Sequence, residues 1–308
     1  MSTVYVDPAF QSDRMMNEIY QGAIVVREHS AATEKFAALA RAQIETAFDG
    51  MDPRLAQHQL EVEGFVDRFA PLKSSFIHDP RSRDGMRAIL GELGFDADDT
   101  YIDVPRMRVS TSGGYLTSGV AYAHHPHRDT WYSAPMAQVN WWLPIYDYAT
   151  SAGMAFHPQY WSRAVRNGSD AFDYYHWNAK GRKEARLHVR SDTRVQPHAE
   201  EPLDLDPELR IVVRPGGIVA FSAAQLHSTC PNKSGESRWS VDFRTVSLDH
   251  VIALRGASNQ DSHPTGTSLR DFVRMRDGSK MPEEVARAYD DRLAVEGEFV
   301  YTGAEAGR

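Results

Sequence analysis

Two histidines and one aspartate have the types and the spacing to hold a metal ion. One residue separates His127 from Asp129, and His227 follows far downstream in a β-rich region. Two imidazoles and one carboxylate are the ligands of the facial triad that holds non-haem Fe(II) with open coordination positions. If residues 127–129 form an extended strand, both side chains leave one face and reach the same ion. The pattern therefore indicates an oxygen-activating iron enzyme.

The third ligand is expected at the end of a strand. His227 comes after Pro215-Gly216-Gly217, which predicts a tight turn feeding a short buried strand. A barrel brings the ends of such strands together, so a ligand distant in sequence is expected on this architecture. The ligands alone do not identify the metal, because zinc and nickel bind similar groups more tightly than Fe(II).

Other histidines compete for the role of ligand. His124 and His125 precede His127, and His125-Pro126-His127 could form the His-x-His of a cupin site. The cupin pattern also needs a glutamate a few residues later, where this chain has aromatic residues, so Asp129 is the preferred carboxylate. Four further histidines are expected to be polar residues of a solvated loop, namely His157, His176, His188 and His198.

Arg238 and Ser240 follow His227 and form a candidate carboxylate clamp. On one strand both side chains point to the same face, where they present a charged fork and a hydroxyl. A buried guanidinium without a partner is costly, so an inward Arg238 either awaits an anion or pairs with Asp242. If Arg238 awaits an anion, the clamp is a binding site for one end of a dicarboxylate.

These residues together resemble a known family. The resemblance is to the Fe(II)/2-oxoglutarate-dependent dioxygenases of the phytanoyl-CoA hydroxylase type, and it rests on His127-x-Asp129, Pro215-Gly216-Gly217, His227, Asn232, Ser234 and Arg238. It covers about residues 101–246 and implies a double-stranded β-helix. It also implies that His127, Asp129 and His227 bind iron and that Arg238 binds the C5 carboxylate of 2-oxoglutarate. Ser240 resembles the serine of the Arg-x-Ser pair in related oxygenases, which implies that it binds 2-oxoglutarate together with Arg238.

The implied reaction consumes 2-oxoglutarate and O₂, releases succinate and CO₂, and oxidises a C–H bond of a small organic metabolite. The halogenase branch of the superfamily replaces the carboxylate ligand by a small residue, whereas Asp129 is retained here. Hydroxylation is therefore expected, and desaturation or ring closure stays open.

Residues near the triad have both functional and structural interpretations. Gln138 and Asn140 share a strand face and are expected to contact 2-oxoglutarate or to orient the ligands, unless they only pack in the barrel. Trp131 and Tyr132 are expected to line the substrate pocket, although aromatic pairs beside a β core are often packing.

Two arginines are candidates for binding an anionic substrate. Arg106 and Arg108 share a strand face, and the alternative is exposed charge on an outer sheet. Arg244 continues the face of Arg238, where pairing with Asp242 is the alternative to substrate binding.

The elements that must position these residues fall into three parts of one expected oxygenase domain, 1–308. Residues 1–100 are expected to be mostly helical, with helices at 31–49, within 53–72 and at 82–93. The expected fold class is α+β with a mainly β core. Residues 101–248 are expected to form this core, with strands near 102–110, 119–123, 137–145, 210–213, 218–221 and 239–246. A polar, aromatic insert at 155–207 suggests a lid. Residues 249–308 form a C-terminal extension with a helix from 282.

Composition limits the partners. The chain carries a formal charge of -8, which argues against nucleic acid or an anionic membrane as the main partner. One cysteine and no long apolar run favour a cytoplasmic protein acting on a small molecule, and a homodimer stays open. Two alternatives remain: a cupin-like metalloenzyme that does not use 2-oxoglutarate, and a non-catalytic jelly-roll binding module.

Overall fold

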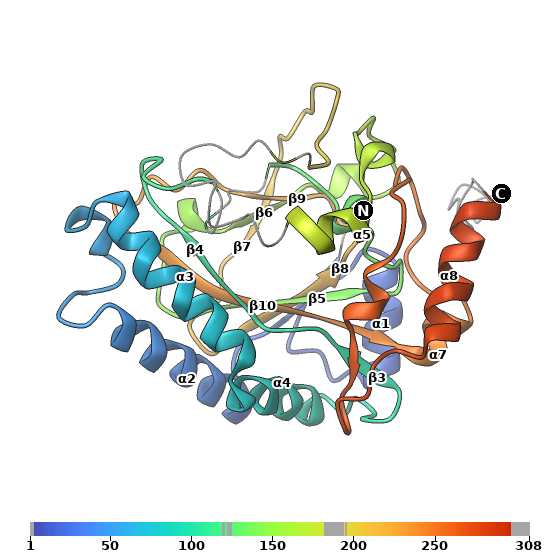
Figure 1. The fold of residues 1–308 in the computed structure, drawn as a ribbon, viewed down its shortest axis with the longest axis horizontal. Coiled ribbons are helices and arrows are strands. Elements are labelled where there is room, and N and C mark those ends of the chain that lie inside the picture. The colour runs from blue at the N-terminus through green and yellow to red at the C-terminus, as the bar shows by residue number, and fades with distance from the viewer. Residues whose placement is uncertain (1–2, 119–120, 122–124, 182–193, 195, 297–308) are drawn as a thin grey trace.

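A mixed β-sheet of eight strands crosses the computed structural model (Figure 1). The structure describes residues 3–118, 121, 125–181, 194 and 196–296. The strand order is β1-β2-β8-β5-β10-β3-β11, and β4 also pairs with β10. The strands are β1 (Val4–Val6), β2 (Ile24–Arg27), β3 (Thr100–Ile102), β4 (Arg106–Ser110), β5 (Val139–Pro144), β8 (Ile218–Ser222), β10 (Arg238–Ser247) and β11 (Val273–Arg274). The β1–β2 pair is parallel and the other pairs are antiparallel.

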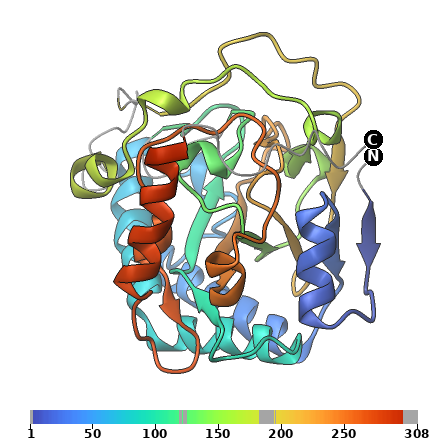
Figure 2. The ribbon, with the colours of Figure 1, turned by 90° about the vertical axis from the view of Figure 1, so that its right-hand side faces the viewer.

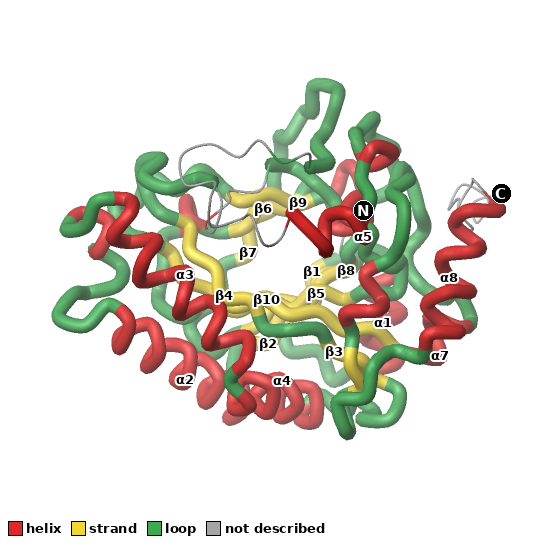
Figure 3. The backbone as a smooth tube through the Cα atoms, viewed as in Figure 1, coloured by secondary structure: helices red, strands yellow, loops and turns green. Residues whose placement is uncertain are grey.

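A second sheet of three antiparallel strands faces this one (Figure 3). Its order is β7-β6-β9, with bounds β6 (Met154–Phe156), β7 (Leu209–Ile211) and β9 (His227–Thr229). Phe156 of β6 meets Phe221 of β8 edge to face, with ring centroids 5.0 Å apart. Trp142 and Val219 belong to the same buried cluster. This cluster holds the two sheets together on one side of the space between them.

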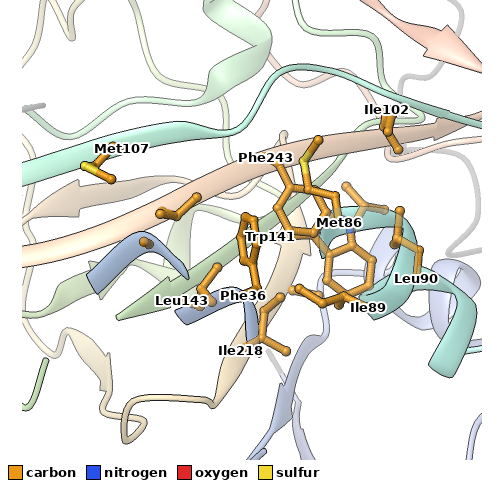
Figure 4. Close-up of a cluster of buried hydrophobic side chains, with 14 of the residues drawn as sticks. Phe36, Met86, Ile89, Leu90, Ile102, Met107, Trp141, Leu143, Ile218 and Phe243 are labelled. Carbon is orange, nitrogen blue, oxygen red and sulfur yellow. The ribbon is translucent and has the colours of Figure 1, made fainter. Parts of the chain in front are cut away.

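Alternating side chains divide β5 and β10 into an apolar face and a polar face. Trp141 and Phe243 stack on the apolar face with ring planes 9° apart, and helical residues such as Phe36 and Met86 cover them (Figure 4). The intervening residues point into the space between the sheets. The period of two in a strand thus places packing residues and polar residues on opposite sides.

Helices cover the apolar face and one end of the sheet. In Figure 1, α2, α3 and α4 run along the lower face, and Figure 2 shows α1 and α8 flanking one end. The helices are α1 (Ser12–Tyr20), α2 (Ala31–Ala47), α3 (Val62–His78), α4 (Pro80–Glu92), α5 (Tyr174–His176), α7 (Leu248–Ile252) and α8 (Glu283–Glu296). The architecture is α+β with a mainly β core, as the sequence predicted. Among the described residues, no helix combines the length and the apolar character needed to cross a membrane.

Two of the three helices predicted before residue 100 match α2 and α4 within two residues at each end, and the third does not match α3. Ser30 caps α2 as predicted, since its side chain accepts a hydrogen bond from the backbone N–H of Thr33 at 3.2 Å. The prediction of a helix within 53–72 is wrong in its bounds, because residues 53–61 form turns around a short 3-10 helix (Ala56–His58) and α3 runs from Val62 through Pro71 to His78. Pro71 only removes one donor, and packing of Phe69 and Phe76 keeps the helix continuous.

The amino-terminal part also contributes two strands that the sequence analysis missed. β2 adds to the edge of the sheet beside β8, and β1 pairs outside it. A short run such as Ile24–Arg27, with three apolar residues and one arginine, does not distinguish a strand from the end of a helix. The strand predicted at 119–123 lies outside the described residues except for Ala121, which is in a helical turn.

The strand predicted at 102–110 is two strands separated by a bulge. Ile102 pairs with Thr245 and Arg106 pairs with Asp242, so β3 and β4 together have one residue more than the opposing stretch of β10. The side chain of Asp103 in this bulge accepts a hydrogen bond from the backbone N–H of Arg244 at 2.8 Å. The bulge therefore directs a buried carboxylate toward the polar face of β10.

Candidate metal centre and cavity

His127 and His227 meet through a two-residue antiparallel bridge. The backbone N–H of each donates to the carbonyl of the other at 3.0 Å, and their rings lie 4.4 Å apart between centroids. Asp129 opens a 3-10 turn (Asp129–Tyr132), and its backbone N–H donates to the carbonyl of Ala223 at 2.9 Å. The expected extended backbone is present at His127 and Arg128, and the chain turns only from Asp129 onward.

The three side chains nevertheless converge. Ligand atoms of His127, Asp129 and His227 lie within 4.8 Å of one another, and Nε2 of His127 is 3.3 Å from Oδ1 of Asp129. Nδ1 of His127 is 2.7 Å from the carbonyl of His125, and Nδ1 of His227 is 2.9 Å from the carbonyl of Gln225. With Nδ1 as the donor in each ring, Nε2 carries the lone pair that a metal needs.

His125 thus faces the triad through its carbonyl, and its side chain is not part of the triad. His124 lies outside the described residues.

Electrostatics favour the metal-binding protonation states. Burial and the neighbouring His127 lower the pKa of His227 to about 4. Burial alone would raise the pKa of Asp129, but the hydrogen bond with His127 and the charge of Arg244 hold it well below its usual range. The site therefore presents a neutral imidazole and an ionised carboxylate near neutral pH.

Two amides orient the carboxylate of Asp129. Nδ2 of Asn140 donates to Oδ2 of Asp129 at 2.9 Å, and Nε2 of Gln138 donates to Oδ1 of Asn140 at 2.8 Å. Gln138 fixes which end of the Asn140 amide faces the aspartate. Both residues are buried, and their contacts match the predicted role of orienting a ligand.

A cavity of about 650 Å³ opens beside the triad, between the two sheets. Arg238 lines it together with Trp142, Phe221 and Met154. Nη1 of Arg238 donates to Oγ of Ser240 at 2.7 Å, its Nε donates to the carbonyl of Ala152 at 3.1 Å, and its guanidinium lies 5.3 Å from the Trp142 ring centroid.

Arg238 is a buried cation without a carboxylate partner among the described residues. The alternative pairing with Asp242 is not formed, because Asp242 lies against Arg108 at 2.7 Å and Arg244 at 3.1 Å. Burial lowers the pKa of Arg238 to about 10, so the group stays charged near neutral pH. A buried charge in a cavity is suited to binding an anion.

The predicted aromatic lining is not found around this cavity. Trp131 is fully buried away from it, where Nε1 donates to Asp261 at 2.7 Å. The rings of Tyr132 and His127 are T-shaped, with their centroids 5.6 Å apart, and the hydroxyl of Tyr132 donates to the carbonyl of Pro197. The packing interpretation fits Trp131, because the 3-10 turn after Asp129 carries it out of the space between the sheets.

The two arginines of β4 lie on its inner face. Arg108 lines the cavity, whereas Arg106 pairs with Asp103 behind it. The side chain of Arg108 is 30% exposed and that of Arg106 is 19% exposed, so the alternative of exposed charge on an outer sheet is wrong. Arg244 pairs with Asp242, as one interpretation of the sequence held. Sequence reasoning missed Asp103, because a bulge leaves no signal in a single sequence.

The described part of the insert, residues 155–181, 194 and 196–207, contains several buried side chains. His157 is fully buried, and Nε2 lies 3.1 Å from Oγ of Ser228, which corrects the expectation of a solvated His157. Tyr160 and Phe172 are also buried. Arg128 crosses from the triad segment to this region, where it pairs with Asp261 at 3.0 Å and donates to the carbonyls of Tyr160 and Arg163. His188 lies outside the described residues.

Comparison with solved structures gives several distant likenesses. They include EvdO2 from Micromonospora carbonacea var. aurantiaca complexed with 2-oxoglutarate (12% identity, 77% of this chain and 92% of that chain, TM-score 0.44). They also include the non-heme alpha ketoglutarate dependent epimerase SnoN from nogalamycin biosynthesis (14% identity, 77% and 84%, TM-score 0.38). A third is the apo form of the non-heme monooxygenase ThoJ (14% identity, 75% and 77%, TM-score 0.39).

A search of curated protein sequences gives no significant match. The family model described as phytanoyl-CoA dioxygenase (PhyH) matches residues 20–240. This match includes all three residues of the triad and spans well over half of the 308 residues. The chain belongs to the phytanoyl-CoA dioxygenase (PhyH) family.

Proposed function

We propose that this protein is an Fe(II)- and 2-oxoglutarate-dependent oxygenase that oxidises a C–H bond of a small organic molecule. The observation that carries the proposal is the combination of the His127, Asp129 and His227 triad with a buried, carboxylate-free guanidinium, Arg238, in one cavity. The membership of the PhyH family supports the same activity. The two facing sheets would be the double-stranded β-helix of that family.

The residues present fit both cofactors. Two imidazole nitrogens and one carboxylate leave open positions on a six-coordinate metal, which is the donor set of non-haem Fe(II) enzymes. Iron with 2-oxoglutarate supplies an oxidant from O₂, with succinate and CO₂ as the other products. Arg238 would bind the carboxylate of 2-oxoglutarate that is remote from the metal, and Ser240 would hold the guanidinium fork in place.

The protein's own contribution is positional. Asn140 and Gln138 fix the carboxylate of Asp129, and the carbonyls of His125 and Gln225 fix the two imidazoles. The apolar side chains of Phe221 and Met154 line the cavity and would restrict the water in it. Hydroxylation is the simplest outcome of C–H oxidation in such a site, and the insert at 155–207 would act as a lid over the substrate.

Anaerobic titration of metal-free protein with Fe(II) and 2-oxoglutarate tests the proposal. A weak visible charge-transfer band is expected when 2-oxoglutarate chelates the iron. Arg238→Ala should need about tenfold to a hundredfold more 2-oxoglutarate to produce it, because a charge-assisted hydrogen-bond pair is lost. Arg276→Gln, which breaks an exposed pair with Asp98, is the control. Iron binding without a band would favour a cupin-like enzyme that does not use 2-oxoglutarate.

A further inference from the structure

A cluster of five charged residues lies on the inner faces of β4 and β10 and on the bulge before β4, beside the triad. Its cations are Arg106, Arg108 and Arg244, and its anions are Asp103 and Asp242. Nε of Arg108 donates to Oδ1 of Asp242 at 2.7 Å, and Arg244 reaches Asp242 at 3.1 Å and Asp103 at 3.6 Å.

Arg106 completes the cluster by pairing with Asp103. Three guanidiniums thus share two carboxylates, which leaves one positive charge.

The groups around the cluster do not cancel this charge. Asp129 lies 3.9 Å from Arg244, but under the proposed function its charge is used by the metal. Glu208 also lines the cavity, where it is already paired with Arg210. Among the described residues, these groups therefore leave the positive charge of the cluster without a counter-charge.

Three members of the cluster line the cavity, namely Arg108, Asp242 and Arg244, and Arg108 is the most exposed of the cluster's cations. Its Nε and Nη2 contact Asp242, whereas its Nη1 makes no hydrogen bond with any described residue. Its side chain is 30% exposed, compared with 19% for Arg106 and 17% for Arg244. A guanidinium can hold one carboxylate through Nε and still offer its other edge to a second.

Arg108 is distinct from the proposed cosubstrate clamp. Arg108 pairs across the sheet with Ser240, and Arg238 pairs with Ser110, so the two guanidiniums are offset along the same cavity wall. The two carboxylates of 2-oxoglutarate would be taken by the metal and by Arg238. With iron, Asp129, 2-oxoglutarate and Arg238 together, the charges at the metal centre sum to zero, and the positive charge beside Arg108 remains.

We propose that Arg108 binds a carboxylate of the organic substrate, which makes the substrate class a monoanionic carboxylic acid small enough for a cavity of about 650 Å³. The proposal rests on the proposed function, because it assigns the rest of the cavity to iron and 2-oxoglutarate. Arg244 and Asp242 hold Arg108 in place from β10. A neutral analogue of the substrate would leave the positive charge without a partner.

The test uses acetate and acetamide as matched probes on protein loaded with Mn(II) and saturating 2-oxoglutarate without O₂. The measured quantity is the relaxation of the probe's methyl protons by the bound Mn(II). Acetate should saturate this effect at about a tenfold lower concentration than acetamide, as expected for a charge-assisted hydrogen bond. Arg108→Gln should abolish the difference, Arg108→Lys should reduce it, and the surface variant Arg276→Gln should leave it unchanged.

Several results would overturn the proposal. They are equal effects of the two probes on wild type, no saturable effect of acetate, and a preference that survives in Arg108→Gln, which would place acetate on the metal. The Fe(II) and 2-oxoglutarate band separates this failure from failure of the proposed function. If wild type and Arg108→Gln form the band alike, only the Arg108 assignment is at stake. If Arg108→Gln raises the 2-oxoglutarate concentration needed for the band as Arg238→Ala does, Arg108 binds the cosubstrate and the inference is wrong.

Discussion

Replacing Asn140 by leucine should weaken metal binding without touching a metal ligand. Nδ2 of Asn140 donates to Asp129 at 2.9 Å, and this is a hydrogen bond to a charged acceptor inside a buried site. Such a bond contributes about 1.5–3 kcal/mol. At 1.4 kcal/mol per factor of ten, the apparent metal affinity should fall by about tenfold to a hundredfold.

A smaller effect is expected from Gln138→Leu. Gln138 does not contact Asp129, but its Nε2 donates to Oδ1 of Asn140 and so keeps the amide of Asn140 in the correct orientation. Without Gln138 the amide can rotate and present its oxygen to the aspartate, which costs part of the hydrogen bond. The order of metal affinities should therefore be wild type, then Gln138→Leu, then Asn140→Leu.

Competition with a chromophoric chelator measures these affinities for Fe(II) or Mn(II). Thermal denaturation of the metal-free variants checks that each still folds, and Arg276→Gln is the control for a substitution remote from the site. An Asn140→Leu protein that folds and binds metal within about twofold of wild type would refute the reasoning, because the hydrogen bond to Asp129 would then contribute almost nothing to ligand geometry.

Two further predictions concern stability. Arg128→Ala should lower the free energy of unfolding by about 3–5 kcal/mol, because it leaves buried Asp261 without its cation; urea denaturation measures this, and a loss below about 1 kcal/mol would contradict it. Burial lowers the pKa of His157 below its ordinary 6.5, so the unfolded chain binds its proton first as the pH falls and unfolding becomes easier. The unfolding free energy of metal-free wild type should therefore fall more steeply below about pH 6.5 than that of His157→Phe, and parallel profiles would show the reasoning to be wrong.

The sequence predicted the chemistry of the site better than its geometry. The residue types of His127, Asp129 and His227 indicated a metal triad, but the bridge of His127 to His227 and the turn that begins at Asp129 were not predicted. The local pattern of residues 127–129 does not contain the hydrogen bond to Ala223 that fixes this turn.

Elements with long periodic patterns were predicted well. The α2 helix and the strands β5, β8 and β10 begin and end within a few residues of their predicted bounds. The bulge at Asp103 and the strands β1 and β2 were missed, since each depends on pairing with a partner distant in the chain. Single-sequence patterns carry no information on such register.

The parts of the large sheet that lie outside the family match determine how this protein can be shortened for expression. The family match spans residues 20–240, but β1 and most of α1 precede it, and β10 continues to Ser247. A truncated gene with these limits would expose the outer edge of β2 to pairing with other chains and would remove Met15, Met16 and Ile19 from the core. It would also end before Asp242 and Arg244. Cloning boundaries should therefore follow the sheet.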